Sequence, residues 1–167
     1  MIKVIIFDLG KVVVYFDQMV SSRKLEKYSS KKADFIFNIL SDRKLVDLHE
    51  TSKINSKEFY KIVKEKISLN LDYDGFISIF NDIFTLNPGV YDLAKKLKEN
   101  YQVYALSNTN KIHFNYIYNK YKLSELFHDV ILSYKVKAVK PHKEIYDYAI
   151  KKTKVKPHEI VYIDDIK

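Results

Sequence analysis

The chain has 167 residues, of which 47% are hydrophobic and 14% aromatic, a composition that excludes a largely disordered protein. Its net charge is +8, but 27 of its 29 basic residues are lysine. Lysine, asparagine, isoleucine and tyrosine are all frequent, as AT-rich coding produces, and no lysine run alternates with aromatic residues as a base-stacking surface would require. We therefore expect no nucleic-acid partner.

The absence of cysteine excludes disulfides and thiolate metal sites. The apolar run Val4–Phe7 near the N-terminus is too short for a signal peptide or a membrane span, and Asp8 interrupts it. We expect a cytoplasmic protein that has no membrane partner. The oligomeric state, monomer or dimer, stays open.

The first predicted element is a strand at Val4–Phe7, since a continuous run of β-branched and aromatic residues is typical of a strand buried on both faces. Residues 12–15 continue the apolar character. Between residues 17 and 84, apolar side chains recur at helical spacing, which predicts three to four amphipathic helices and no strand. Ser56 is expected to begin one of these helices, and Asp72 or Asp74 the next.

Strands and helices alternate after the turn Asn87-Pro88-Gly89. Helices are predicted over residues 90–98, 111–121 and 141–152, and strands over residues 102–106, 129–132 and 160–163. In the last helix, Ile145, Tyr148 and Ala149 are expected to face inward.

Four buried strands that alternate with helices predict an α/β fold with a Rossmann-like parallel sheet. The helical block after the first strand is expected to be an inserted cap. We therefore divide the chain into a core of residues 1–14 and 86–167 and a cap of residues 15–85. Ligands of such sheets bind at the carboxyl ends of the strands.

Polar side chains follow each predicted strand, at the edge where a ligand would bind. In chain order they are Asp8, then Ser107-Asn108-Thr109-Asn110, then Lys140-Pro141, and finally Asp164-Asp165. Any one of these alone is most simply a turn or a helix cap. Together they place three carboxylates, a hydroxyl and an ammonium at one edge. Because crowded carboxylates repel one another unless a cation lies between them, this edge favours Mg²⁺ and a phosphoryl group.

The order of these motifs resembles the haloacid dehalogenase (HAD) superfamily of phosphatases and dehalogenases. The segments Phe7-Asp8-Leu9-Gly10, Leu106-Ser107-Asn108, Lys140-Pro141 and Tyr162-Ile163-Asp164-Asp165 resemble its four motifs across most of the chain. The first two motifs are most similar to those of the α-glucose-1-phosphate phosphatase-like subgroup, in which a helical cap follows the first strand. Residues 46–59 resemble that cap.

This resemblance implies a Mg²⁺-dependent phosphohydrolase that acts on a small phosphorylated metabolite, such as a sugar phosphate. Asp8 would attack phosphorus and form an aspartyl-phosphate, and Lys140 would offset the charge on both groups. Ser107 and Asn108 would hold the phosphoryl oxygens. The implied ligands of Mg²⁺ are Asp8, the carbonyl of Gly10, Asp164 and Asp165.

Two departures from the family pattern affect this interpretation. Most phosphatases of the family carry a second aspartate, a general acid and base, where this chain has Gly10. His49 and Glu50 of the cap are the candidates to replace it. Family members also continue beyond the paired aspartates with a further strand and helix, so we expect that the C-terminus is truncated and that this core lacks them.

Three alternative interpretations stand beside this one. A 2-haloacid dehalogenase would use the same nucleophile on carbon and needs no metal. A catalytically impaired or truncated member would only bind a ligand. A response-regulator receiver domain combines similar side chains, but its acidic pair follows the first strand rather than the fourth.

Overall fold

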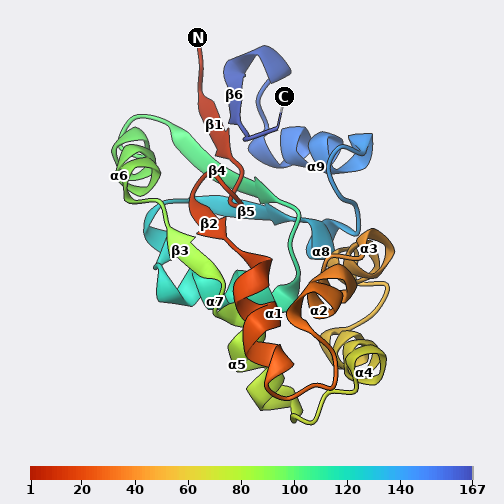
Figure 1. Cartoon of the computed structure of the whole chain (residues 1–167). Helices are drawn as coiled ribbons and strands as arrows, with labels where there is room; N and C mark the ends of the chain where they lie inside the picture. Colours follow the sequence, from red (N-terminus) through yellow and green to blue (C-terminus); the bar gives the residue numbers. More distant parts are fainter. Residues whose placement is uncertain (167) are drawn as a thin grey trace.

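The computed structural model describes residues 1–166, so Lys167, the last residue of the predicted core, lies outside the described residues. Figure 1 shows an α/β molecule in which a parallel sheet lies at one end and a block of helices at the other. The predicted fold class is confirmed.

The main sheet has the strand order β5-β4-β1-β6, and every neighbouring pair in it is parallel. Its strands are β1 (Val4–Phe7), β4 (Gln102–Ser107), β5 (Asp129–Leu132) and β6 (Ile160–Ile163). All four were predicted to within one residue. The helices that follow are α6 (Pro88–Leu97), α7 (Lys111–Lys120), α8 (Ser133–Val136) and α9 (Lys143–Thr153), with 3-10 turns at Leu123–Glu125 and Pro157–Glu159.

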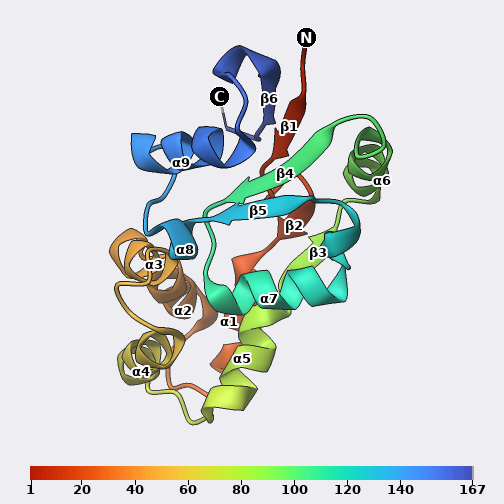
Figure 2. The same cartoon turned by 180° about the vertical axis from the view of Figure 1, so that it is seen from behind.

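Side chains of β1 alternate between two hydrophobic clusters, one on each face of the sheet. Ile5 and Phe7 pack with Ala94 of α6 and Phe114 of α7, whereas Val4 and Ile6 pack with Ile145 of α9 and its neighbours. Figure 2 accordingly shows α7 and α9 on opposite sides of β5. Because β1 is covered on both faces, its whole apolar run is buried, as a central parallel strand requires.

The helical block contains five helices, more than the three to four predicted: α1 (Gln18–Glu26), α2 (Ala33–Leu40), α3 (Arg43–Glu50), α4 (Ser56–Ile67) and α5 (Tyr73–Asn81). They enclose a hydrophobic cluster of their own, which includes Leu25, Ile36, Phe59, Val63 and Phe76. Two antiparallel strands, β2 (Val14–Phe16) and β3 (Phe84–Leu86), connect the block to the sheet. The prediction of no strand up to residue 84 missed the start of β3.

Polar side chains cap the first turns of two helices in the block. Asp72 caps α5 by accepting a hydrogen bond from the backbone N–H of Gly75, which confirms Asp72 rather than Asp74 as the start of that helix. Helix α4 begins at Ser56, as predicted, and the preceding residue, Asn55, is its N-cap and forms a reciprocal capping box with Glu58.

The prediction for the last helix was wrong at Tyr148. This side chain is 44% exposed, whereas Ile145 and Ala149 are buried as expected. Helix α9 begins at Lys143, two residues after the predicted start. A buried face that holds residues 145 and 149 of this short helix leaves residue 148 at its margin.

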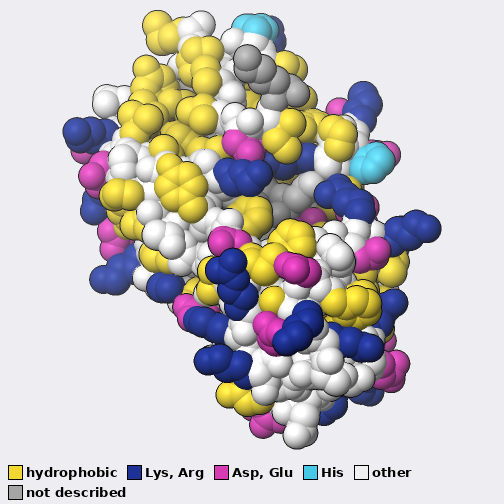
Figure 3. Space-filling view, viewed as in Figure 1, with side chains coloured by type: hydrophobic (Ala, Val, Ile, Leu, Met, Phe, Trp, Pro, Cys, Tyr) yellow, Lys and Arg dark blue, Asp and Glu magenta, His cyan; other side chains and the backbone are white. Residues whose placement is uncertain are grey.

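The surface carries charges of both signs. Figure 3 shows lysine and arginine side chains distributed over one face of the molecule, with aspartate and glutamate among them. Within residues 1–166, none of the helices is both long and apolar enough to cross a membrane.

The cluster inside the helical block predicts a large effect of one substitution. Phe76 is fully buried among aromatic side chains, so Phe76→Ala should lower the free energy of unfolding by about 3–5 kcal/mol. Phe35→Ala is the control, because Phe35 is an exposed side chain of α2. Denaturant unfolding of both variants measures the difference, and equal losses would contradict a packed cluster.

Candidate active site

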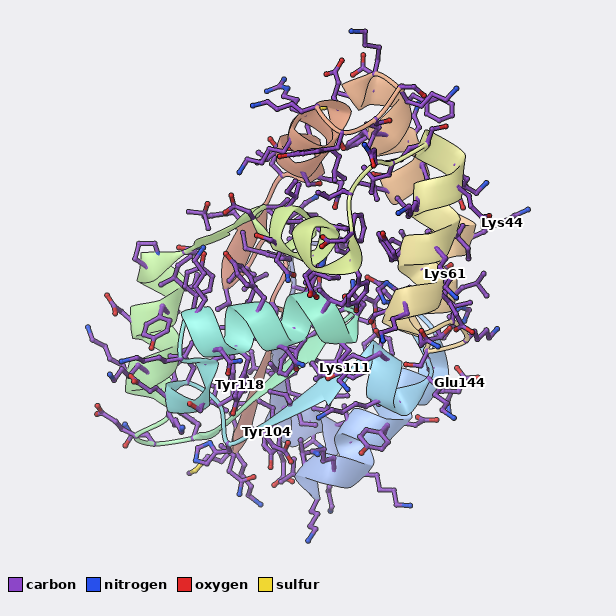
Figure 4. The ribbon with its side chains drawn as sticks, turned by 90° about the horizontal axis from the view of Figure 1, so that it is seen from below. Lys44, Lys61, Tyr104, Lys111, Tyr118 and Glu144 are labelled. Atoms are coloured by element: carbon purple, nitrogen blue, oxygen red, sulfur yellow. The ribbon has the colours of Figure 1, made fainter. Side chains whose placement is uncertain are left out.

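The polar motifs meet at one edge of the sheet because their strands run in parallel. Phe7 pairs in register with Ile163 on one side and Ala105 on the other, so Asp8 and Asp164 leave neighbouring strands at the same level. Ser107 pairs with Leu132 at the end of β5. Figure 4 shows the start of α7, marked by Lys111, at the same edge, and Tyr118 toward the far end of that helix.

Lys140 lies between two carboxylates of this edge. Its Nζ is 3.0 Å from Oδ2 of Asp8 and 2.7 Å from Oδ2 of Asp164, and it also donates to the hydroxyl of Tyr162 at 3.0 Å. Only 12% of the Lys140 side chain is exposed. One largely buried ammonium therefore joins the ends of β1 and β6.

The two carboxylates respond differently to this environment. Burial raises the pKa of Asp8, and the neighbouring charge of Lys140 offsets only part of that rise. Burial acts on Asp164 as well, but hydrogen bonds from Lys140 and Tyr162 outweigh it and hold the pKa of Asp164 at about 2. Asp164 is thus a permanent anion at neutral pH.

Three acidic side chains come together as the sequence predicts. One carboxylate oxygen each from Asp8, Asp164 and Asp165 lie within 4.8 Å of one another. Carboxylates at this spacing are the hard oxygen donors that Mg²⁺ prefers. The residues present therefore fit a magnesium ion, and Gly10, the predicted carbonyl ligand, lines the same pocket.

The loops that carry Asn108 and Lys140 are held to each other. The Asn108 side chain accepts a hydrogen bond from the backbone N–H of Lys140 at 2.7 Å and donates to the Lys140 carbonyl at 3.1 Å. Ser133 fixes the next residue, since its hydroxyl accepts from the Thr109 backbone and donates to the Thr109 carbonyl, both at 2.9 Å. Ser107 is buried beside them.

A pocket of about 390 Å³ lies between the sheet edge and the helical block. Every predicted site residue except Asp164 lines it: Asp8, Gly10, Ser107, Asn108, Lys140 and Asp165. The helical block and its connecting strands contribute a largely apolar wall together with several polar groups: Phe16, Gln18, Leu40, Ser41, Arg43, Val46, His49, Glu50, Phe59, Phe80, Ile83 and Phe84. The sequence motifs thus meet on one side of the pocket. The opposite side is formed by residues of the helical block that belong to none of these motifs.

Several residues of this site were not singled out from the sequence. Tyr162 was named only as part of a motif, yet its hydroxyl donates to Asp164 and accepts from Lys140. Arg43, one of only two arginines, reaches the pocket from the start of α3. Its rarity in a lysine-rich chain was the one sequence signal that marked it.

Two histidines face the pocket, and both are kept neutral by burial. The ring of His49 stacks on Phe59 with centroids 4.4 Å apart, and its pKa falls to about 4. The ring of His113 lies against Phe80 at 4.1 Å and Phe84 at 5.0 Å, and its pKa falls to about 3. Both therefore act as aromatic packing groups at neutral pH.

A model of the haloacid dehalogenase-like hydrolase family matches residues 2–166. The chain belongs to this family, which confirms the resemblance drawn from the four motifs.

Two similar proteins come from Bacteroides thetaiotaomicron. A D-ribitol-5-phosphate phosphatase of Bacteroides thetaiotaomicron is 26% identical over 99% of this chain and 84% of its own length. A HAD family enzyme of the same organism, in complex with magnesium and inorganic phosphate, has a TM-score of 0.88 at 26% identity, covering 100% of this chain and 86% of its own.

A more distant structure shares the fold alone. L-2-haloacid dehalogenase from Xanthobacter autotrophicus, with chloropropionic acid covalently bound, has a TM-score of 0.68 at 16% identity, over 97% of this chain and 69% of its own.

Lys140 should be needed for stability as well as for the site. Lys140→Met leaves Asp8 and Asp164 buried without their cation, so the free energy of unfolding in EDTA at pH 7 should fall by about 3–5 kcal/mol. The matched control is Lys143→Met, which removes an exposed pair with Asp147 and should cost less than about 1 kcal/mol. Equal losses in urea unfolding would show that the buried pairs contribute no more than an exposed one.

Proposed function

We propose that this chain is a Mg²⁺-dependent phosphatase that hydrolyses a small phosphorylated metabolite through an aspartyl-phosphate on Asp8. The observation that carries the proposal is the position of Lys140 between Asp8 and Asp164, with Asp165 close by, at one end of a pocket large enough for a small molecule. The similar D-ribitol-5-phosphate phosphatase supports a sugar or polyol phosphate as the substrate class.

The side chains have complementary roles in this proposal. A carboxylate oxygen of Asp8 attacks phosphorus in line with the leaving oxygen, and Lys140 offsets the negative charge that the two groups bring together. Ser107 and the backbone of Asn108 hold phosphoryl oxygens. The hydrogen bonds that fix Asn108 to Lys140 keep these groups at a constant separation, so that little reorganisation is needed during the reaction.

Asp8, Asp164, Asp165 and the Gly10 carbonyl would hold the magnesium ion. When bound, Mg²⁺ supplies charge that the phosphoryl oxygens need and that the three carboxylates otherwise oppose. The helical block of residues 15–85 is the proposed cap, because it closes the pocket over this edge and supplies most of the wall that a leaving group would contact.

The proposal predicts metal-dependent turnover that Asp8 controls. The wild-type protein should hydrolyse p-nitrophenyl phosphate and members of a sugar- and polyol-phosphate panel, EDTA should abolish this activity, and Asp8→Asn should reduce it to background. Phosphate release measures the rate, and a thermal melt of the variant shows that it is folded. Turnover that survives Asp8→Asn, absence of turnover on every substrate, or halide release from 2-chloropropionate in EDTA would each overturn the proposal.

A further inference from the structure

The proposed phosphatase reaction lacks a proton donor within the first motif. Gly10 stands where an acid would be expected, and a Cβ atom built there would lie 3.2 Å from the ring of Phe16. A side chain at this position would thus require the ring of Phe16 of β2 to shift slightly, and the glycine itself offers no acid. A proton for the leaving oxygen has to come from another part of the pocket.

Other ionisable groups of the pocket are committed elsewhere. Lys140 is held by two carboxylates, and Lys11 lies 3.9 Å from Asp165. Arg43 pairs with Asp47 at 3.1 Å and keeps its charge at every relevant pH. His49 and His113 are neutral at pH 7 and so lack the acidic proton of an imidazolium, because burial lowers the pKa of both rings well below 7.

Glu50 is the remaining acid in the pocket wall. It is the last residue of α3, and within residues 1–166 its carboxylate makes neither a hydrogen bond nor an ion pair. Burial raises its pKa to about 7 against the opposing charge of Arg43, and the charges of Asp8 and Lys140 also act on it. It is thus protonated in a large fraction of molecules near neutral pH, and it lines the same pocket as the nucleophile Asp8.

We infer that Glu50 is the general acid and base of this site, delivered by the cap in place of the absent aspartate of the first motif. The inference rests on the proposed phosphatase function. As the O–P bond from Asp8 forms and the bond to the leaving oxygen breaks, the Glu50 carboxyl gives its proton to that oxygen, which departs as an alcohol. The Glu50 carboxylate then takes a proton from water, whose oxygen attacks phosphorus and breaks the bond to Asp8, so that phosphate leaves and Glu50 is protonated again.

This role predicts an effect that depends on the leaving group. Glu50→Gln should slow hydrolysis of an alkyl phosphate from the panel by about 10²–10⁴-fold, because an alkoxide leaves poorly without a proton. Formation of the aspartyl-phosphate from p-nitrophenyl phosphate should stay within about tenfold of wild type, since p-nitrophenolate needs no proton. The second step lacks its base in both cases, so the variant should release a burst of p-nitrophenol and accumulate protein heavier by one phosphoryl group.

Rapid-quench kinetics and intact-protein mass spectrometry measure these quantities, with Glu65→Gln as the control. Glu65 is an exposed residue of the cap helix α4, outside the pocket, and its substitution should leave all rates unchanged. Glu50→Asp keeps a carboxyl group at this position and should recover part of the rate that Glu50→Gln loses. Such a recovery would show that the rate falls because the acid is missing and not because the protein is misfolded.

The outcomes distinguish this inference from the proposed function. If wild-type protein shows no Mg²⁺-dependent turnover, the phosphatase proposal fails first. If wild type is active, two results would overturn the role of Glu50. One is that Glu50→Gln retains turnover of the alkyl phosphate within about threefold. The other is that Glu50→Gln slows the first step equally on both substrates without accumulating phosphoprotein.

Discussion

The contact of Lys140 with Asp8 and Asp164 is the interaction on which the site depends. Two carboxylates at the ends of neighbouring parallel strands would repel each other at this spacing, and a low-dielectric setting makes that repulsion larger. The ammonium between them compensates both charges, and Tyr162 adds a hydrogen bond to Asp164. The backbone on either side of Lys140 is in turn fixed by Asn108. The four segments that carry Asp8, Asn108, Lys140 and Asp164 are thereby held at one edge by a few short contacts.

Much of this edge could be predicted from the sequence, because the composition of each strand is visible locally and parallel strands bring their ends to the same side of the sheet. The four runs of β-branched residues marked the strands of the sheet, and parallel strands must end on the same side. Asp8, Ser107, Lys140 and Asp165 could then be placed together although up to 157 positions separate them, and all four line one pocket. Their catalytic roles stay predictions.

The rest of the pocket could not be predicted in the same way, because its wall depends on how helices pack rather than on where they lie in the sequence. Helical periodicity identifies an apolar face, but it did not separate the five short helices or show that Tyr148 lies outside the buried face of its helix. Helical periodicity also does not indicate which way a polar side chain at the end of a helix points. Arg43 and Glu50 begin and end α3, and only the packing of that helix over the sheet edge brings both into the pocket.

A glycine is acceptable at position 10 if the strand ends and the helical block supply different parts of the proposed reaction. Phosphoryl chemistry needs charges held at fixed separations, and the strand ends provide them. Proton transfer needs a group that meets the leaving oxygen, and in the proposed reaction this oxygen faces the pocket wall that the helical block forms. A side chain at position 10 would require the ring of Phe16 to shift by a few tenths of an ångström, whereas Glu50 at the end of α3 already lines the pocket from the side of the helical block. In the proposed reaction the proton donor therefore belongs to the same helical block that walls the pocket and limits the access of water to it.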